Sequence, residues 1–265
     1  MIYLKLTKLY LRLNNNYWVH KNMSFEKRPN LRLLMLKLRH QIKRRYFIMA
    51  NKNLTEMVFI LDRSGSMNGL EADTIGGYNS LLEKQRKEVG DATVTTVLFD
   101  DQYEMIHDHA AIGKVKDITN KEYFARGCTA LLDAVGKTIN HVGNRHKNAL
   151  DSEVPGKIMI VIITDGYENA SREYTLPQVK QMIERQKEKY VWEFLFLGAN
   201  IDAVTTAAGF GISADRAVTY EADSVGTRMN FDAVSNVACC MRQSAPIAGN
   251  WKENIEEHKR KKGRK

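Results

Sequence analysis

The chain has 265 residues, enough to bury a sizeable core in one domain with extensions. Its formal net charge is +9, but residues 1–49 hold 12 of the 40 Lys and Arg and one of the 31 acids. The remainder therefore carries 28 bases and 30 acids, so the overall charge does not indicate a nucleic-acid-binding body.

The basic extension over residues 1–48 has three interpretations. It is a basic amphipathic arm for membrane or nucleic acid, a disordered tail, or sequence upstream of a true start at Met49. We favour the last, because Met49 lies only a few residues before the first predicted strand. Leucines at helical spacing predict a helix over 31–46 in any case.

The chain shows no membrane or secretion signal. No run approaches the roughly 18 apolar residues of a transmembrane helix, and charges interrupt every apolar stretch near the N-terminus. Three cysteines are too few, and odd in number, for a disulfide framework. A cytoplasmic location is therefore expected.

Short apolar runs and helical periods alternate along the first half of the body. Residues 57–61 are continuously apolar, which predicts a strand buried on both faces. A helix is expected over 73–89, with Val89 among its core side chains. Residues 93–99 and 103–107 are β-rich runs around a polar turn and predict a hairpin.

The second half continues the alternation. Residues 130–143 predict an amphipathic helix and residues 158–163 the strongest buried strand. Thr175 and Gln178, with Pro177 between them, form a helix-start signature. The remaining predictions are strands over 192–197 and 217–220 and helices over 201–209 and 223–242.

This order predicts an α/β fold with a doubly wound, mostly parallel, Rossmann-like sheet. One edge strand is expected to be antiparallel, with helices on both faces. The domain is predicted over 49–243, and residues 244–265 are predicted to be a basic, disordered tail. His107-Asp108-His109 could chelate a metal, but we favour a polar loop at the hairpin end, since no third ligand is evident.

Polar clusters follow two buried strands and precede one helix. They are Asp62-Arg63-Ser64-Gly65-Ser66, Gly127-Cys128-Thr129 and Thr164-Asp165-Gly166. Ligands of doubly wound sheets bind where strand ends converge, and a charge at the edge of a core needs a partner. Two carboxylates and three hydroxyls suit Mg²⁺ or Mn²⁺. The alternative is a set of turn and capping residues.

Taken together, Asp62, Ser64, Ser66, Thr129 and Asp165 resemble the metal-ion-dependent adhesion site (MIDAS) of von Willebrand factor A (VWA) domains. The resemblance covers about residues 54–243 and is closest to stand-alone intracellular bacterial members. It implies direct binding of the metal by Ser64 and Ser66. It further implies binding by Thr129 directly or through water, and by the two aspartates largely through water.

Three neighbours of these residues have open roles. Tyr167 and Glu168 follow Asp165 and could rim the site and contact a partner, or belong to a solvated loop. Cys128 stands where the family commonly has glycine. We favour a small space-filling residue there over a redox-sensitive thiol.

The resemblance implies a metal-dependent protein-interaction module that binds an acidic residue of a partner protein. The alternative is a metal-dependent phosphatase or hydrolase, in which Asp62, or next Glu168, would act as base. No Ser–His–Asp grouping, phosphate loop or dinucleotide fingerprint indicates another enzyme class. A nucleic-acid partner is not favoured, because the terminal Lys/Arg cluster over 259–265 lacks aromatic residues. The partner protein and the oligomeric state stay open.

Overall fold

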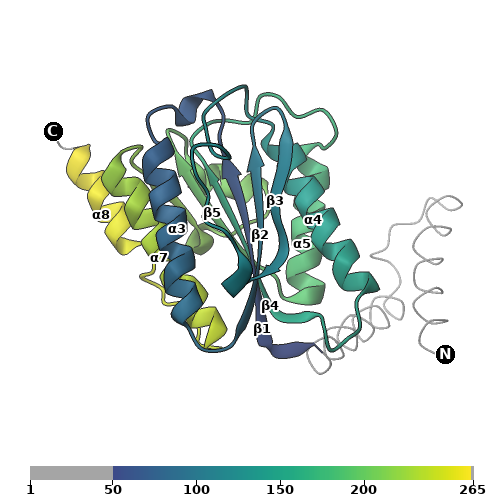
Figure 1. The fold of residues 1–265 in the computed structure, drawn as a ribbon. Coiled ribbons are helices and arrows are strands. Elements are labelled where there is room, and N and C mark those ends of the chain that lie inside the picture. Colours follow the sequence, from purple (N-terminus) through teal and green to yellow (C-terminus); the bar gives the residue numbers. More distant parts are fainter. Residues whose placement is uncertain (1–49, 264–265) are drawn as a thin grey trace, which may run out of the picture. The chain divides into compact units, whose positions relative to one another are not determined.

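The computed structural model describes residues 50–263, so the predicted extension over 1–48, with its helix over 31–46, lies outside the described residues. Six strands in this part form one sheet in the order β3-β2-β1-β4-β5-β6 (Figure 1). They are β1 (Asn51–Asp62), β2 (Asp91–Phe99), β3 (Tyr103–Ala111), β4 (Pro155–Thr164), β5 (Glu193–Ala199) and β6 (Ala217–Tyr220). Strands β2 and β3 pair antiparallel and the other pairs are parallel. The predicted mostly parallel sheet with one antiparallel edge strand is thereby confirmed.

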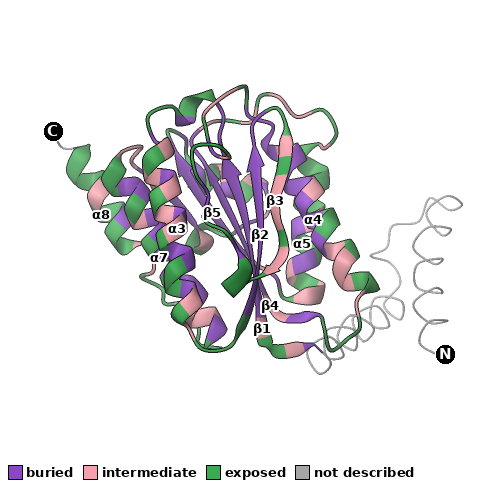
Figure 2. Cartoon of the chain, in the orientation of Figure 1, coloured by how far each residue is buried: buried purple, intermediate pink, exposed green. Residues whose placement is uncertain are grey.

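The central strand β1 has a core on each of its faces. Met57 and Phe59 belong to one apolar cluster, whereas Val58 and Ile60 belong to the other. Successive side chains of a strand point to opposite faces, so a continuous apolar run fits a strand covered on both sides. Figure 2 shows the central strands of the sheet mostly buried, whereas the edge strand β3 is half-buried to exposed.

Helices cover both faces of the sheet. They are α3 (Glu71–Lys87), α4 (Leu131–Asn148), α5 (Leu176–Tyr190), α6 (Ala203–Gly209), α7 (Ser224–Arg242) and α8 (Glu253–Lys262). Side chains of α3, α7 and α8 join the cluster of Phe59, and those of α4, α5 and α6 join the cluster of Val58. In Figure 1, α3, α7 and α8 stand on one side of the sheet and α4 and α5 on the other. Three short 3-10 turns complete the described elements, over Gly65–Met67, Ile112–Lys114 and Ala214–Arg216.

Local sequence signals mark some helix ends correctly and miss others. The capping box at the start of α5 is confirmed: the Thr175 backbone N–H donates to Gln178 Oε1 at 2.8 Å, with Pro177 in the first turn. The prediction that Val89 faces the core is wrong. Helix α3 ends at Lys87, so Val89 lies beyond the periodic segment and is 91% exposed.

The C-terminal segment differs from the expected disordered tail over 244–265. Helix α8 packs beside β6, and its Ile255 is buried in the core. The Lys252 ammonium donates to the carbonyls of Ala214 and Ala217, both at 2.8 Å. The sequence of α8 is mostly charged and has one buried apolar side chain, Ile255, which is why its composition indicated disorder. Residues 264–265 lie outside the described part.

His107, Asp108 and His109 lie within strand β3 and not in a loop at the hairpin end. Asp108 accepts a hydrogen bond from Arg145 at 2.6 Å, and His107 Nδ1 lies 3.1 Å from Thr96 Oγ1. The sequence indicated a loop because these residues are polar, whereas the partners that they bind in the strand lie on other elements. Among the described residues, no helix is long and apolar enough to cross a membrane.

Candidate metal centre

The candidate centre lies where β1 and β4 end side by side. Leu61 and Ile163 are paired in register, so Asp62 and Thr164 leave the sheet at the same edge. The Asp62 carboxylate is held from both sides: Oδ1 accepts the Ser64 backbone N–H at 2.7 Å and Oδ2 accepts Thr164 Oγ1 at 2.6 Å. Thr164 therefore orients Asp62, a role that the sequence did not reveal.

Two serines connect this loop to the next strand end. Ser64 Oγ lies 3.1 Å from Ser66 Oγ, and Ser66 Oγ donates to Asp165 Oδ1 at 2.5 Å. The other carboxylate oxygen, Asp165 Oδ2, is buried and has no hydrogen-bond partner among the described residues. A buried carboxylate oxygen without a partner is costly and indicates a missing positive group.

The electrostatics of the two aspartates agree with that need. Burial, with a smaller contribution from the charge of Asp165, raises the pKa of Asp62 to about 6, although the hydrogen bonds from Thr164 and Ser64 act to lower it. Burial also raises the pKa of Asp165. Two acids that resist ionisation at one site are stabilised as carboxylates by a cation between them.

Gly166 shows that Thr129 belongs to the same cluster. A Cβ added to Gly166 would lie 3.3 Å from both Ser66 Oγ and Thr129 Oγ1. Thr129 is held in place by Asn169, whose Oδ1 accepts its backbone N–H at 2.9 Å. The structure thus brings all five candidate residues together from three distant segments.

The donor set suits a hard divalent cation. Its members offer only oxygen: three hydroxyls and two carboxylates, the choice that Mg²⁺ and Mn²⁺ favour. Among the described residues no group of three or more His, Cys, Asp or Glu could hold a metal. A centre here would depend on hydroxyl ligands, since only Asp62 and Asp165 supply charge.

Adding a methyl group at Gly166 is expected to weaken metal binding. Gly166→Ala would crowd the hydroxyls of Ser66 and Thr129, and we expect affinity for Mg²⁺ to fall about tenfold, or about 1.4 kcal/mol. Calorimetric titration measures this. The control is Gly113→Ala, where the added Cβ meets nothing within 4 Å; equal affinities of the two variants would contradict the placement.

Hydrogen bonds from Arg63 and Arg126 hold the loops of the site together. Arg63 is fully buried, and its Nε donates to Asp100 Oδ2 at 3.0 Å. Arg126 Nε donates to the same oxygen at 2.6 Å. The Asp100 carbonyl also accepts the Ala130 backbone N–H at 2.9 Å, next to Thr129. Sequence reasoning missed this network because its members lie far apart in the chain, and no local pattern links them.

The two rim candidates differ in position. Tyr167 is 61% exposed, beside Asp165, and is available to a partner. Glu168 is not: its carboxylate accepts hydrogen bonds from the backbone of Leu132, Ala170 and Ser171 at 2.7 to 2.9 Å. Its role is to tie the loop to the start of α4, which corrects the rim interpretation.

Cys128 does not fill space beside the metal loop. Its side chain is exposed, so the expectation of a small buried residue there is wrong. The preceding Gly127 has φ +64°, and a Cβ on it would lie 2.6 Å from Asp101 Oδ1. This backbone conformation turns Cys128 outward and leaves Thr129 facing the site.

Comparisons with known proteins reveal the fold alone. No family model matches the sequence, and no curated protein matches it. Proximal thread matrix protein 1 of the mussel byssus is 14% identical with a TM-score of 0.51, over 72% of this chain and 47% of that one. Another structure of that protein, with a zinc-occupied MIDAS motif, is 15% identical with a TM-score of 0.48, over 72% and 46%.

A von Willebrand factor type A protein from Catenulispora acidiphila is 11% identical with a TM-score of 0.47, over 71% of this chain and 43% of that one. The chain thus spans less than half the length of these structures. The described part has a VWA-like α/β fold.

Proposed function

We propose that this chain is a metal-dependent protein-interaction module. Its cation, Mg²⁺ or Mn²⁺, would be held by Asp62, Ser64, Ser66, Thr129 and Asp165, and an acidic side chain of a partner protein would complete the coordination. The observation that carries the proposal is the buried, unpartnered Asp165 Oδ2 amid clustered hydroxyls. We further propose that the protein works in the cytoplasm, as a stand-alone bacterial member of this class.

The charge balance supports an acidic ligand. Two carboxylates and three neutral hydroxyls neutralise a divalent cation without excess negative charge. When most of the ligands are neutral, the ion keeps an affinity for a further anionic oxygen. Tyr167, largely exposed beside Asp165, offers a partner an aromatic surface at the same edge.

No specific observation favours the hydrolase alternative. A hydrolase would need a free general base close to the ion. The Asp62 carboxylate is occupied by Ser64 and Thr164, and that of Glu168 is saturated within its loop. The site is better suited to binding than to proton transfer.

Metal removal tests the cation. Mg²⁺ at a hundredfold excess over its Kd is expected to raise the free energy of unfolding by about 2.7 kcal/mol. Asp62→Asn and Asp165→Asn should lose this gain, and Asp232→Asn, an exposed acid on α7, should keep it. Urea unfolding with Mg²⁺ and with EDTA measures the difference. Equal gains in all four proteins would refute the assignment.

The partner is tested separately. Immobilised protein is expected to retain a partner from cell extract in Mg²⁺ and to release it on addition of EDTA. Asp165→Asn should not retain any protein that EDTA can release, while Asp232→Asn should behave as wild type. Retention that survives EDTA would count against a ligand bound through the metal.

A further inference from the structure

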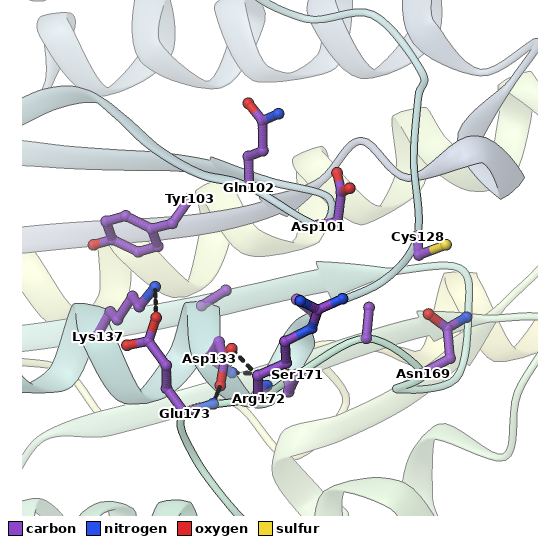
Figure 3. A pocket seen from close by; sticks show the side chains of 13 residues that line it. Asp101, Gln102, Tyr103, Cys128, Asp133, Lys137, Asn169, Ser171, Arg172 and Glu173 are labelled. Atoms are coloured by element: carbon purple, nitrogen blue, oxygen red, sulfur yellow. Dashed lines mark hydrogen bonds and ion pairs between the residues drawn. The ribbon is translucent and has the colours of Figure 1, made fainter.

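A cavity of about 510 Å³ lies beside the candidate metal centre. Its wall is formed by the turn between β2 and β3, the first turns of α4 and the loop after β4 (Figure 3). Cys128 and Ala130, the chain neighbours of Thr129, both line it. A ligand group bound at Thr129 therefore has this cavity as its immediate neighbour.

The acids in the wall are mostly used within the protein. Asp133 accepts three successive backbone N–H groups, those of residues 172–174, at 2.8 to 2.9 Å. The carboxylate of Glu173 lies 2.7 Å from the Lys137 ammonium. The remaining acid, Asp101, is exposed to solvent. Two of the three acids in the wall are thus held by partners within the protein, and Asp101 is the third.

The wall also holds hydrogen-bond donors that the described residues do not use. Asn169 Oδ1 accepts from Thr129 and Gln102 Oε1 accepts from Arg126, so the NH₂ ends of both amides are left over. Arg172 is exposed, and its guanidinium makes no hydrogen bond or ion pair with any residue from 50 to 263. Figure 3 shows it extending into the space between the labelled side chains. The cavity therefore presents unused donors, one of them cationic.

We propose that this cavity is a second subsite, which binds a carboxylate of the partner through Arg172, with the amides of Asn169 and Gln102. The proposal rests on the proposed function, because the first carboxylate of the same partner would be the one at the metal. The partner's recognition segment is then doubly acidic. Arg172 selects it, since a guanidinium binds a carboxylate in a planar, two-pronged geometry.

The two acids of such a segment have to lie close together. The cavity adjoins the candidate metal centre, because Cys128 and Ala130, each next to Thr129 in the chain, line it. In an extended segment, residues i and i+2 point to the same side, about 7 Å apart. A segment of the form Asp-x-Asp can therefore place one carboxylate at the metal and the other in the cavity.

Two synthetic peptides test the subsite on the full chain. They are acetyl-Gly-Gly-Asp-Gly-Gly-amide, with one acid, and acetyl-Gly-Asp-Gly-Asp-Gly-amide, with two. Their Kd values are measured by NMR titration in Mg²⁺ and in EDTA. Wild type, Arg172→Gln and Arg185→Gln are compared; Arg185 is an exposed arginine on α5, outside the cavity wall. This control accounts for any general electrostatic attraction between the acidic peptide and the basic chain.

In Mg²⁺, wild type and Arg185→Gln are expected to bind the two-acid peptide about tenfold more tightly than the one-acid peptide. This preference should be absent in EDTA. Arg172→Gln should bind both peptides as wild type binds the one-acid peptide. If Arg172→Gln keeps the tenfold preference, or if wild type binds both peptides equally with metal dependence, the subsite is refuted while the proposed function stands. If neither peptide shows metal-dependent binding, the proposed function fails, and the subsite fails with it.

Discussion

Replacing Glu56 by glutamine is expected to lower the free energy of unfolding by about 3–5 kcal/mol. Glu56 is fully buried in β1 and binds Arg145, with His146 Nε2 at 2.7 Å and Thr95 Oγ1 at 3.2 Å. Removing its charge leaves the guanidinium of Arg145 with less compensation in a partly buried place. The effect is large because the carboxylate of Glu56 is fully buried among its partners, and Arg145 keeps only its ion pair with Asp108.

Urea unfolding at neutral pH measures this loss. The control is Glu83→Gln, which removes an exposed ion pair with Lys87 and is expected to cost less than about 0.5 kcal/mol. Similar losses in the two variants would mean that the cluster around Glu56 contributes no more than a surface pair does.

The difference in stability between wild type and Glu56→Gln is also expected to depend on pH. Burial raises the pKa of Glu56, but the nearby imidazole of His109, the hydrogen bond with His146 and the charge of Arg145 outweigh it and hold the pKa well below its ordinary value. The folded-state pKa thus lies below the unfolded value of about 4.3. The stabilisation is complete above that value and is lost as pH falls below it. The stability advantage of wild type over Glu56→Gln should therefore shrink below about pH 4, and an advantage that grows there would contradict this assignment.

Truncating Ile255 to alanine is expected to cost about 2–5 kcal/mol. Ile255 is the buried residue of α8, 1% exposed, and it belongs to the same apolar cluster as Phe59 at the sheet centre. Its removal would leave a cavity under the helix. If residues 244–262 were a disordered tail, the substitution would have no effect.

Thermal unfolding of Ile255→Ala, with Leu150→Ala as control, separates these outcomes. Leu150 is 68% exposed, so its truncation is expected to change stability by less than about 0.5 kcal/mol. A loss confined to Ile255→Ala would establish that α8 belongs to the cooperative core. Equal, small effects would contradict the docking of this helix.

The order of the elements was predictable because it depends on local periodicity. The apolar run over 57–61 and the helical spacing over 130–143 each identify an element that buries one or two faces. The parallel sheet then follows from the alternation of strands and helices. Boundaries were less certain: α3 ends at Lys87, two residues before the predicted end, and Val89 is exposed.

The candidate site was predictable in its members but not in its supports. Asp62, Ser64, Ser66, Thr129 and Asp165 stand at predicted strand ends or a helix start, and strands of one parallel sheet end at one edge. Thr164, the last residue of β4, and Asn169, in the loop that follows, orient Asp62 and Thr129 but are residue types common at any strand end or turn. Their roles depend on distances that local patterns do not contain.

By itself, the sequence determined the fold class, the strand order along the chain and the five oxygen donors that converge at one edge. These depend on period and position, which are local properties. Only the tertiary structure decided that Asp100 is shared by Arg63 and Arg126, that Glu168 ties its loop to the start of α4 and that α8 is docked. Each of these joins residues far apart in the chain, where pairing depends on three-dimensional proximity and not on spacing.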